Sequence, residues 1–165
     1  MTKQTYFWAV DTLLDAYNEG RLFHGKCAAC AVGTLLQTHK WAAHFLTVSG
    51  KNKPRSPWWD QVLLSADKRQ TFQEELDYFL YTRYEKKGFT REELEKIERE
   101  FEMSIYSSKE GYEYWVREEN RKQGQYIGLC AVLKVMESMV DEDVKENNSQ
   151  ERLDKIATEK YHLVV

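Results

Sequence analysis

Apolar residues recur every three or four positions along most of this chain, with no convincing alternation of apolar and polar residues. A spacing of three to four places apolar side chains on one face of an α-helix, whereas alternation is typical of a half-buried strand. Only two prolines interrupt these segments. The pattern therefore predicts an all-α fold, a single-domain multi-helix bundle of about six to eight helices with no substantial sheet.

The clearest helix start in the sequence lies at Phe89–Leu94. Thr90 and Glu93 have the spacing of a capping box, and Phe89 can pack on Leu94 as a hydrophobic staple. Ser107 and Glu110 repeat the capping-box spacing, and Gly124 is expected to interrupt the helix that they open. Helices are predicted over 5–19, 27–37, from 56, over 67–88 and 90–105, from 107, over 127–140, and over 149–161 with Ser149 as its cap.

A chain of this length can bury a sizeable core without a disulfide or a metal, so residues 1–165 are predicted to form one domain. Residues 38–56 are expected to be irregular or loop-rich. Residues 141–149 are expected to be an acidic, polar connection to a short C-terminal helix. Cys30-Ala31-Val32 recurs as Cys130-Ala131-Val132, which two similar helices packed together at the domain centre would explain.

The charges of the chain nearly balance, with 24 basic and 27 acidic residues and a net charge of −3. This balance disfavours nucleic-acid binding, which depends on neutralising phosphates with Lys and Arg. No signal-type apolar run is present, and no apolar stretch approaches the ~20 residues that span a bilayer. These absences predict no membrane association, and three cysteines in such a chain favour a reducing, cytoplasmic location.

The best candidate for chemistry is His24-x-x-Cys27-x-x-Cys30. Imidazole and thiolate are zinc ligands, and this spacing lets both sulfurs reach one ion. A fourth ligand could come from His39, His44 or Cys130. The alternatives are a redox dithiol, a Cys27 nucleophile with His24 or His44 as its base, or buried cysteines that act as small hydrophobes. The last reading is favoured because the cysteines lie among Ala, Val and Leu and no second ligand pair follows.

A second cluster combines basic and aromatic residues, as single-stranded nucleic-acid sites do. It consists of Lys51, Lys53, Arg55, Trp58 and Trp59. The favoured interpretation is a solvated loop that leads into a helix with buried tryptophans, because Ser56-Pro57 is a good helix start.

Residues 91–102 contain many glutamates interspersed with Arg91, Lys96 and Arg99. This mixture indicates an exposed helix with ordinary ion pairs more than a cation site. Motifs for nucleotide phosphates, zinc proteases and serine hydrolases are absent, so no catalytic residue is predicted.

Three blocks resemble an uncharacterised group of small helical proteins from gut bacteria and their phages. They are Gly25–Gly33 (GKCAACAVG), Phe89–Glu102 (FTREELEKIEREFE) and Gly128–Leu133 (GLCAVL). The resemblance implies an intracellular helical protein of prophage or mobile-element origin, and it assigns no activity and no site residue.

These observations predict a non-enzymatic helical protein that binds another protein or itself, without a cofactor. Trp and Tyr often anchor interfaces, and the chain has five Trp and ten Tyr. The alternative is a metal or thiol site at His24, Cys27 and Cys30, for which zinc is the cofactor. A second alternative is nucleic-acid binding through Lys51–Trp59.

Overall fold

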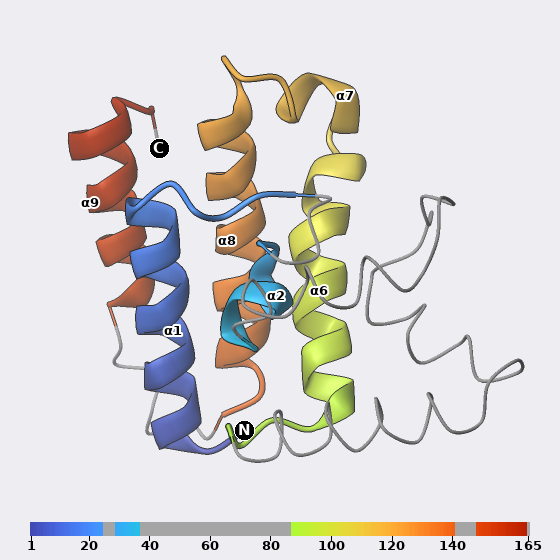
Figure 1. The fold of residues 1–165 in the computed structure, drawn as a ribbon, viewed down its shortest axis with the longest axis vertical. Helices are drawn as coiled ribbons and strands as arrows, with labels where there is room; N and C mark the ends of the chain where they lie inside the picture. Colours follow the sequence, from blue (N-terminus) through green and yellow to red (C-terminus); the bar gives the residue numbers. More distant parts are fainter. Residues whose placement is uncertain (25–28, 37–86, 141–147, 165) are drawn as a thin grey trace, which may run out of the picture.

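The computed structural model describes residues 1–24, 29–36, 87–140 and 148–164. They form six helices and, within these ranges, no strand, which confirms the predicted all-α class (Figure 1). The helices are α1 (Lys3–Asn18), α2 (Ala31–Leu35), α6 (Arg91–Tyr106), α7 (Tyr112–Trp115), α8 (Arg121–Glu137) and α9 (Ser149–Tyr161). None of these helices is long and apolar enough to cross a membrane. The helices predicted from 56 and over 67–88, and the loop-rich segment 38–56, lie outside the described residues.

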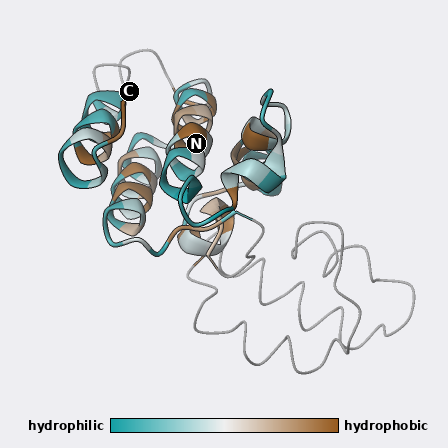
Figure 2. Cartoon of the chain, turned by 90° about the horizontal axis from the view of Figure 1, so that it is seen from above, coloured by the Kyte–Doolittle hydropathy of each residue, from teal (hydrophilic) through white to brown (hydrophobic). Residues whose placement is uncertain are grey.

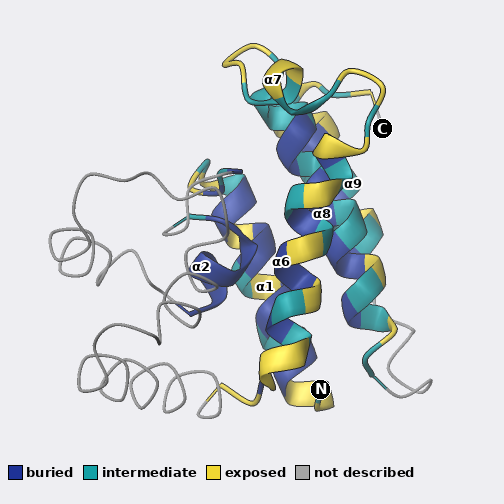
Figure 3. Cartoon of the chain, turned by 90° about the vertical axis from the view of Figure 1, so that its right-hand side faces the viewer, coloured by how far each residue is buried: buried dark blue, intermediate teal, exposed yellow. Residues whose placement is uncertain are grey.

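The long helix α8 lies at the centre of the described bundle, where it packs against α6, α9 and α1 (Figure 1). The short helix α2 fills the space between α1 and α6, and α7 forms a turn between α6 and α8. Apolar residues concentrate where the helices face one another (Figure 2), and every residue of α2 is buried (Figure 3). The largest fully buried side chains are Tyr6, Leu13, Leu14, Tyr17, Leu22, Leu35, Ile97, Phe101, Ile105, Leu129 and Leu133.

α1 begins and ends close to its predicted bounds of 5–19. Thr2 caps its N-terminus by accepting a hydrogen bond from the amide of Thr5 at 3.1 Å. Gly20 follows its C-terminus with a φ of +73°, a left-handed conformation that glycine adopts without steric cost.

The capping box of α6 is confirmed. The amide of Glu93 donates to Thr90 Oγ1 at 3.2 Å, and the amide of Thr90 donates to Glu93 Oε2 at 2.8 Å. Phe89 and Leu94 are both buried beside it.

The helix start predicted at Ser107 is wrong. Ser107 ends α6, because its amide still donates to the carbonyl of Met103 at 2.9 Å. α7 begins only after Gly111, whose φ is +75°.

The helix break predicted at Gly124 is also wrong. α8 runs through this residue, where a Cβ would lie 3.0 Å from Trp115 Cβ. Glycine is used there for close packing and not for a break.

The second helix is shorter than predicted, because Ala29 lies in a turn and Cys30 is the N-cap of α2. The two Cys-Ala-Val segments also differ, since Cys130 lies within α8 and α2 packs chiefly on α1 and α6. The repeated tripeptide therefore does not mark two equivalent helices packed on each other.

The last helix has the predicted bounds, but Ser149 is its first residue and Asn148 its N-cap. The Ser149 hydroxyl donates to Glu137 Oε1 at 3.2 Å, which joins the start of α9 to the end of α8. The acidic connection predicted over 141–149 lies almost entirely outside the described residues.

Candidate functional site

His24, the first residue of the predicted zinc site, is packed into the core beside α6. Its Nε2–H donates to the carbonyl oxygen of Phe101 at 3.0 Å. Its ring stacks on the Phe101 ring with centroids 4.0 Å apart and planes at 3°. Burial lowers the pKa of His24 to about 4, although the hydrogen bond to Phe101 opposes the shift. The imidazole is therefore neutral near pH 7 and one of its nitrogens is engaged in a backbone contact.

Cys30 is buried and caps the N-terminus of α2. The amide of Gly33 donates to its Sγ at 3.2 Å, a weak capping bond of the type that Ser or Asp usually accepts. Burial raises the pKa of the Cys30 thiol well above its usual value, and the nearby Glu98 carboxylate raises it further. A thiol in this state is a poor nucleophile because the thiolate is the reactive form.

Phe23, just before His24, lies beside Ala29, just before Cys30, since the Phe23 amide donates to the Ala29 carbonyl at 2.8 Å. Cys27 and the proposed fourth ligands His39 and His44 lie outside the described residues. Within the part of the chain that is described, no group of three or more His, Cys, Asp or Glu could hold a metal ion. The zinc site at His24, Cys27 and Cys30 stays a prediction.

The predicted exposed face of residues 91–102 needs one correction. Glu98 is only 3% exposed and lies beside the Cys30 thiol, whose pKa its charge raises. Its position follows from helical spacing, because it comes four residues after Leu94 and three before Phe101, both buried. The sequence contained this signal, but the run of glutamates concealed it.

A second buried polar residue, Gln125 of α8, is fully inaccessible. Its side-chain amide donates to the carbonyl of Leu22, in the segment that leads from α1 to His24. This hydrogen bond and the His24–Phe101 bond hold that segment against α8 and α6. The sequence had no pattern that marked Gln125, because its partner is 103 residues away.

Cys130 lies at a different contact, where α8 meets α9. The Gln150 side chain donates to its Sγ at 3.3 Å and to Asp154 Oδ1 at 2.7 Å. Tyr126, one turn before Cys130, donates to the same Asp154 oxygen at 2.8 Å. Cys30 and Cys130 therefore belong to separate environments, and the structure does not bring them together as ligands of one ion.

The basic-aromatic cluster of Lys51, Lys53, Arg55, Trp58 and Trp59 lies outside the described residues. Its assignment to nucleic-acid binding stays a prediction.

An open groove of about 640 Å³ runs between α6 and α8 on the outer side of α8. Its α8 wall is lined by Ile127, Ala131 and Val135, which are spaced by four residues and are all partly exposed. Glu100 and Ser104 line it from α6, and Tyr126, Cys130 and Lys134 complete it on α8. The groove is mainly apolar with charged residues at its rim, as protein-binding surfaces are.

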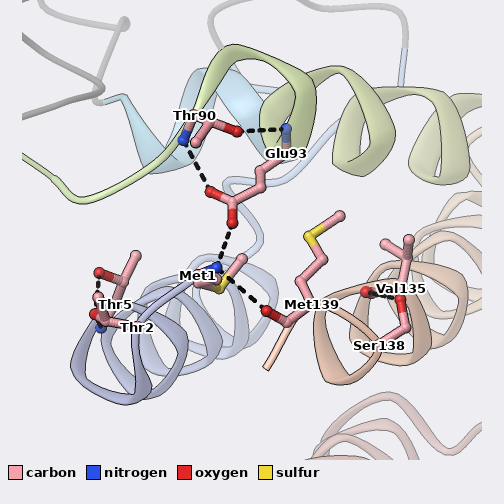
Figure 4. Close-up of polar contacts among 8 residues, drawn as sticks. All are labelled: Met1, Thr2, Thr5, Thr90, Glu93, Val135, Ser138 and Met139. Atoms are coloured by element: carbon pink, nitrogen blue, oxygen red, sulfur yellow. Dashed lines mark hydrogen bonds and ion pairs between the residues drawn. The ribbon is translucent and has the colours of Figure 1, made fainter. Parts of the chain in front are cut away.

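The first residues of the chain lie at the end of α8 opposite α7 (Figure 1), and Met1 lies between Glu93 and Met139 (Figure 4). The ammonium group of Met1 forms an ion pair with Glu93 Oε1 and donates to the carbonyl of Met139 at 3.2 Å. Met1 is partly buried and packs against the core. Glu93 thus contacts Met1 with one oxygen and the capping box of α6 with the other, which joins α1, α6 and the end of α8.

At the opposite end of α1, aromatic and basic side chains of α8 and α9 cover its last carbonyls. The Tyr161 hydroxyl donates to the carbonyls of Tyr17 and Asn18 at 2.6 and 2.8 Å. Lys122 Nζ lies 4.4 Å from the centre of the Tyr161 ring, and Lys160 Nζ donates to Asn18 Oδ1 at 3.2 Å. Cations at the negative end of a helix are stabilising, so a structural role accounts for this cluster.

No protein-family model matches this chain, and neither a curated protein nor a solved structure matches it. The resemblance to helical proteins of gut bacteria and phages, with the mobile-element origin that it implies, therefore stays a prediction.

Proposed function

We propose that this protein acts by binding another protein through the outer face of α8. The observation that carries the proposal is that α8 is apolar on opposite sides. Its inner side supplies Leu129, Val132, Leu133 and Met136 to the core. Its outer side supplies Ile127, Ala131 and Val135 to the open groove beside α6.

A helix that is apolar around its circumference is normally covered on all sides. Within the described bundle α6, α9 and α1 pack against α8, and the groove side is still open. An amphipathic helix that lays its apolar side chains into such a groove is a common way for proteins to bind each other. This supports a role in protein recognition.

Two further large apolar side chains are exposed near the end of α6, the aromatic Tyr106 at 52% and Met103 at 48%. The Tyr106 ring stacks on Tyr112 with centroids 4.5 Å apart. Such residues add contact area at an interface for little loss of side-chain entropy.

The thiol and metal alternative is weakened by the contacts of two of its three residues. His24 donates to Phe101, and Cys30 caps α2 with its pKa raised by burial. Both contacts are those of interior packing, and a buried free thiol suits the reducing cytoplasm that we propose as the location.

Native-state alkylation followed by peptide mass spectrometry tests whether Cys30 is a buried, unreactive thiol. We expect Cys30 to react more slowly than in the unfolded chain by on the order of 100-fold; fast labelling or stoichiometric zinc in the purified protein would favour the alternative.

The proposal is tested by a photo-cross-linking amino acid placed at Lys134, which lies on the groove rim and is exposed. Lys155 is the matched control, because it is an exposed lysine on α9 that does not line the groove. We expect irradiation in cells to attach a second polypeptide at position 134 and not at position 155. The adduct should be lost when Ala131→Glu places a charge in the groove. The absence of any adduct at position 134 would refute the proposal.

A further inference from the structure

The start of α8 lies beside the ends of α1 and α9 (Figure 1), and three basic residues gather there: Arg121, Lys122 and Lys160. We propose that these three residues, named the cation cluster below, bind a small acyl phosphate, which transfers its acyl group to the Lys122 amine. The proposal goes beyond protein recognition and does not depend on the α6–α8 groove.

The cation cluster has no acidic partner among the described residues, because none of its members belongs to an ion pair there. Arg121 and Lys160 both lie close enough to Lys122 to repel its charge. The Arg121 guanidinium lies 5.1 Å from the centre of the Phe23 ring, and its buried Nε has no hydrogen-bond partner in the described part of the chain. Like charges that no carboxylate balances favour an anionic ligand.

The first turn of α8 adds to this positive potential. Arg121 and Lys122 are its first two residues, no side chain caps it, and it contains no acidic residue. The amide end of a helix favours negative charge, so two cations in this turn are the reverse of the usual preference. A phosphate group held by the cation cluster and the free amides of this turn would make the arrangement favourable.

The Lys122 amine is not needed for the structural role of this region. Tyr161 and Lys160 supply the hydrogen bonds that cover the end of α1, whereas Lys122 Nζ donates only to the Tyr161 hydroxyl, at 3.4 Å. Burial lowers the pKa of Lys122, and the charges of Arg121 and Lys160 lower it further. More of the unprotonated, nucleophilic amine is therefore present near pH 7 than at an ordinary lysine.

An acyl phosphate combines the anion that the cation cluster favours with an electrophilic carbon that an amine attacks. The Lys122 nitrogen bonds to the acyl carbon, an amide forms, and the C–O bond to the phosphate breaks. The phosphate leaves with the proton that the nitrogen loses, so no other reactant is required. Cations around the departing phosphate stabilise its charge. The product is an acylated lysine without a positive charge.

Quantitative peptide mass spectrometry after incubation of the folded full chain with acetyl phosphate tests the proposal. Lys134 and Lys155 are the internal controls, because they are exposed lysines outside the cation cluster. We expect Lys122 to be acetylated about tenfold faster than either control, as local enrichment of an anion at clustered cations allows.

A second reagent separates anion binding from amine reactivity. The N-hydroxysuccinimide ester of acetic acid acetylates lysines but carries no phosphate, so its preference for Lys122 should be smaller. Inorganic phosphate, added at constant ionic strength, should slow the reaction of Lys122 with acetyl phosphate and leave its reaction with the ester unchanged.

Variants test whether the cation cluster is the binding site. Arg121→Gln and Lys160→Gln should each bring the Lys122 rate with acetyl phosphate closer to that of Lys134, whereas Lys155→Gln should leave it unchanged. Circular dichroism checks the fold of each variant. Lys160 is exposed, so its variant provides the test if Arg121→Gln does not fold.

Three results would each overturn the proposal. The first is equal acetylation of Lys122 and the two control lysines by acetyl phosphate. The second is a preference for Lys122 that is the same with both reagents or that phosphate does not reduce, because the amine would then react without a bound anion. The third is an unchanged Lys122 rate in folded Arg121→Gln or Lys160→Gln.

Discussion

At Gly128 the backbone of α8 packs closely against the His24–Phe101 stack. A Cβ there would lie 2.6 Å from His24 Nε2 and 2.8 Å from Phe101 Cδ2. Gly128→Ala should therefore lower the free energy of unfolding by about 1–2 kcal/mol, because the overpacking exceeds the gain in helix propensity. Chemical denaturation measures the change. Gly124→Ala is the comparison and should cost less, because a Cβ at position 124 would lie 3.0 Å from Trp115 of the short helix α7. A Gly128→Ala variant with unchanged stability would contradict the packing described.

His24 should make stability depend on pH in a defined window. Its pKa falls from 6.5 to about 4 in the folded protein, so between these values the unfolded chain binds a proton that the folded chain does not. The free energy of unfolding should then decrease as pH falls from 6.5 to about 4, by up to about 3 kcal/mol, and the His24 contribution should level off below that. Denaturation at several pH values measures the slope. His24→Gln should flatten it in this window, and an equal slope in both proteins would show that His24 is not the group responsible.

Buried polar residues are the least predictable part of the candidate site. Glu98 follows the helical spacing of Leu94 and Phe101, so its burial could have been inferred from the sequence. Gln125 could not, because its hydrogen bond to Leu22 depends on how α8 lies against the segment after α1. His24 was singled out only as a candidate zinc ligand, and its stacking on Phe101 also depends on contacts between distant parts of the chain.

At the scale of single elements, the capping box of α6 should be measurable. Thr90→Ala removes the bond from the Glu93 amide and should lower stability by about 1 kcal/mol. Glu93→Ala should cost more, since Glu93 also pairs with the Met1 ammonium group. Glu93→Gln removes the charge but can keep the hydrogen bond from the Thr90 amide. Thermal denaturation of Glu93→Ala and Glu93→Gln therefore separates the contribution of the capping box from that of the ion pair with Met1. Glu95→Ala, at an exposed Arg91 pair, is the control and should cost under about 0.5 kcal/mol; equal losses at 93 and 95 would argue against the box.

The two capping-box spacings, at Thr90 and at Ser107, differ in the residues that precede them, and only the first starts a helix. Thr90 and Ser107 open the same spacing to a glutamate, but Thr90 follows Gly88, whose φ of +80° ends any preceding helix. Ser107 comes directly after α6 and is still bonded to Met103. A capping-box spacing indicates that a helix can start at a residue, but whether it does depends on the backbone conformation just before that residue. Gly124 was also ambiguous in the sequence, because glycine is used both to break a helix and to allow close packing, here on Trp115.

At the scale of the whole molecule, α9 should unfold together with the rest of the bundle. Leu153 is fully buried, and α9 contacts both α1 and α8. Leu153→Ala should lower stability by about 3 kcal/mol in a single cooperative transition. Hydrogen exchange should show α1 losing protection together with α9. If α9 alone lost protection, it would be an independent appendage and the described bundle would not be one cooperative unit.

The groove illustrates what the sequence could not supply. Apolar residues are frequent from Ile127 to Val140, and the helix predicted there is part of α8. Which side faces outward depends on where α6 and α9 pack. Those contacts are set by pairs such as Tyr126–Asp154 and Phe101–Gly128, which no local pattern reveals.

The bond between Tyr161 and Tyr17 joins residues 144 positions apart, and this separation has a consequence during synthesis. Ribosomes add about 5–20 residues each second, so α1 leaves the exit tunnel roughly 7–30 s before the helix that covers its end has been made. For that interval the apolar side of α1 must stay exposed or be held by a chaperone. Slowing translation between the two helices should therefore lower the yield of native protein more than slowing it after α9.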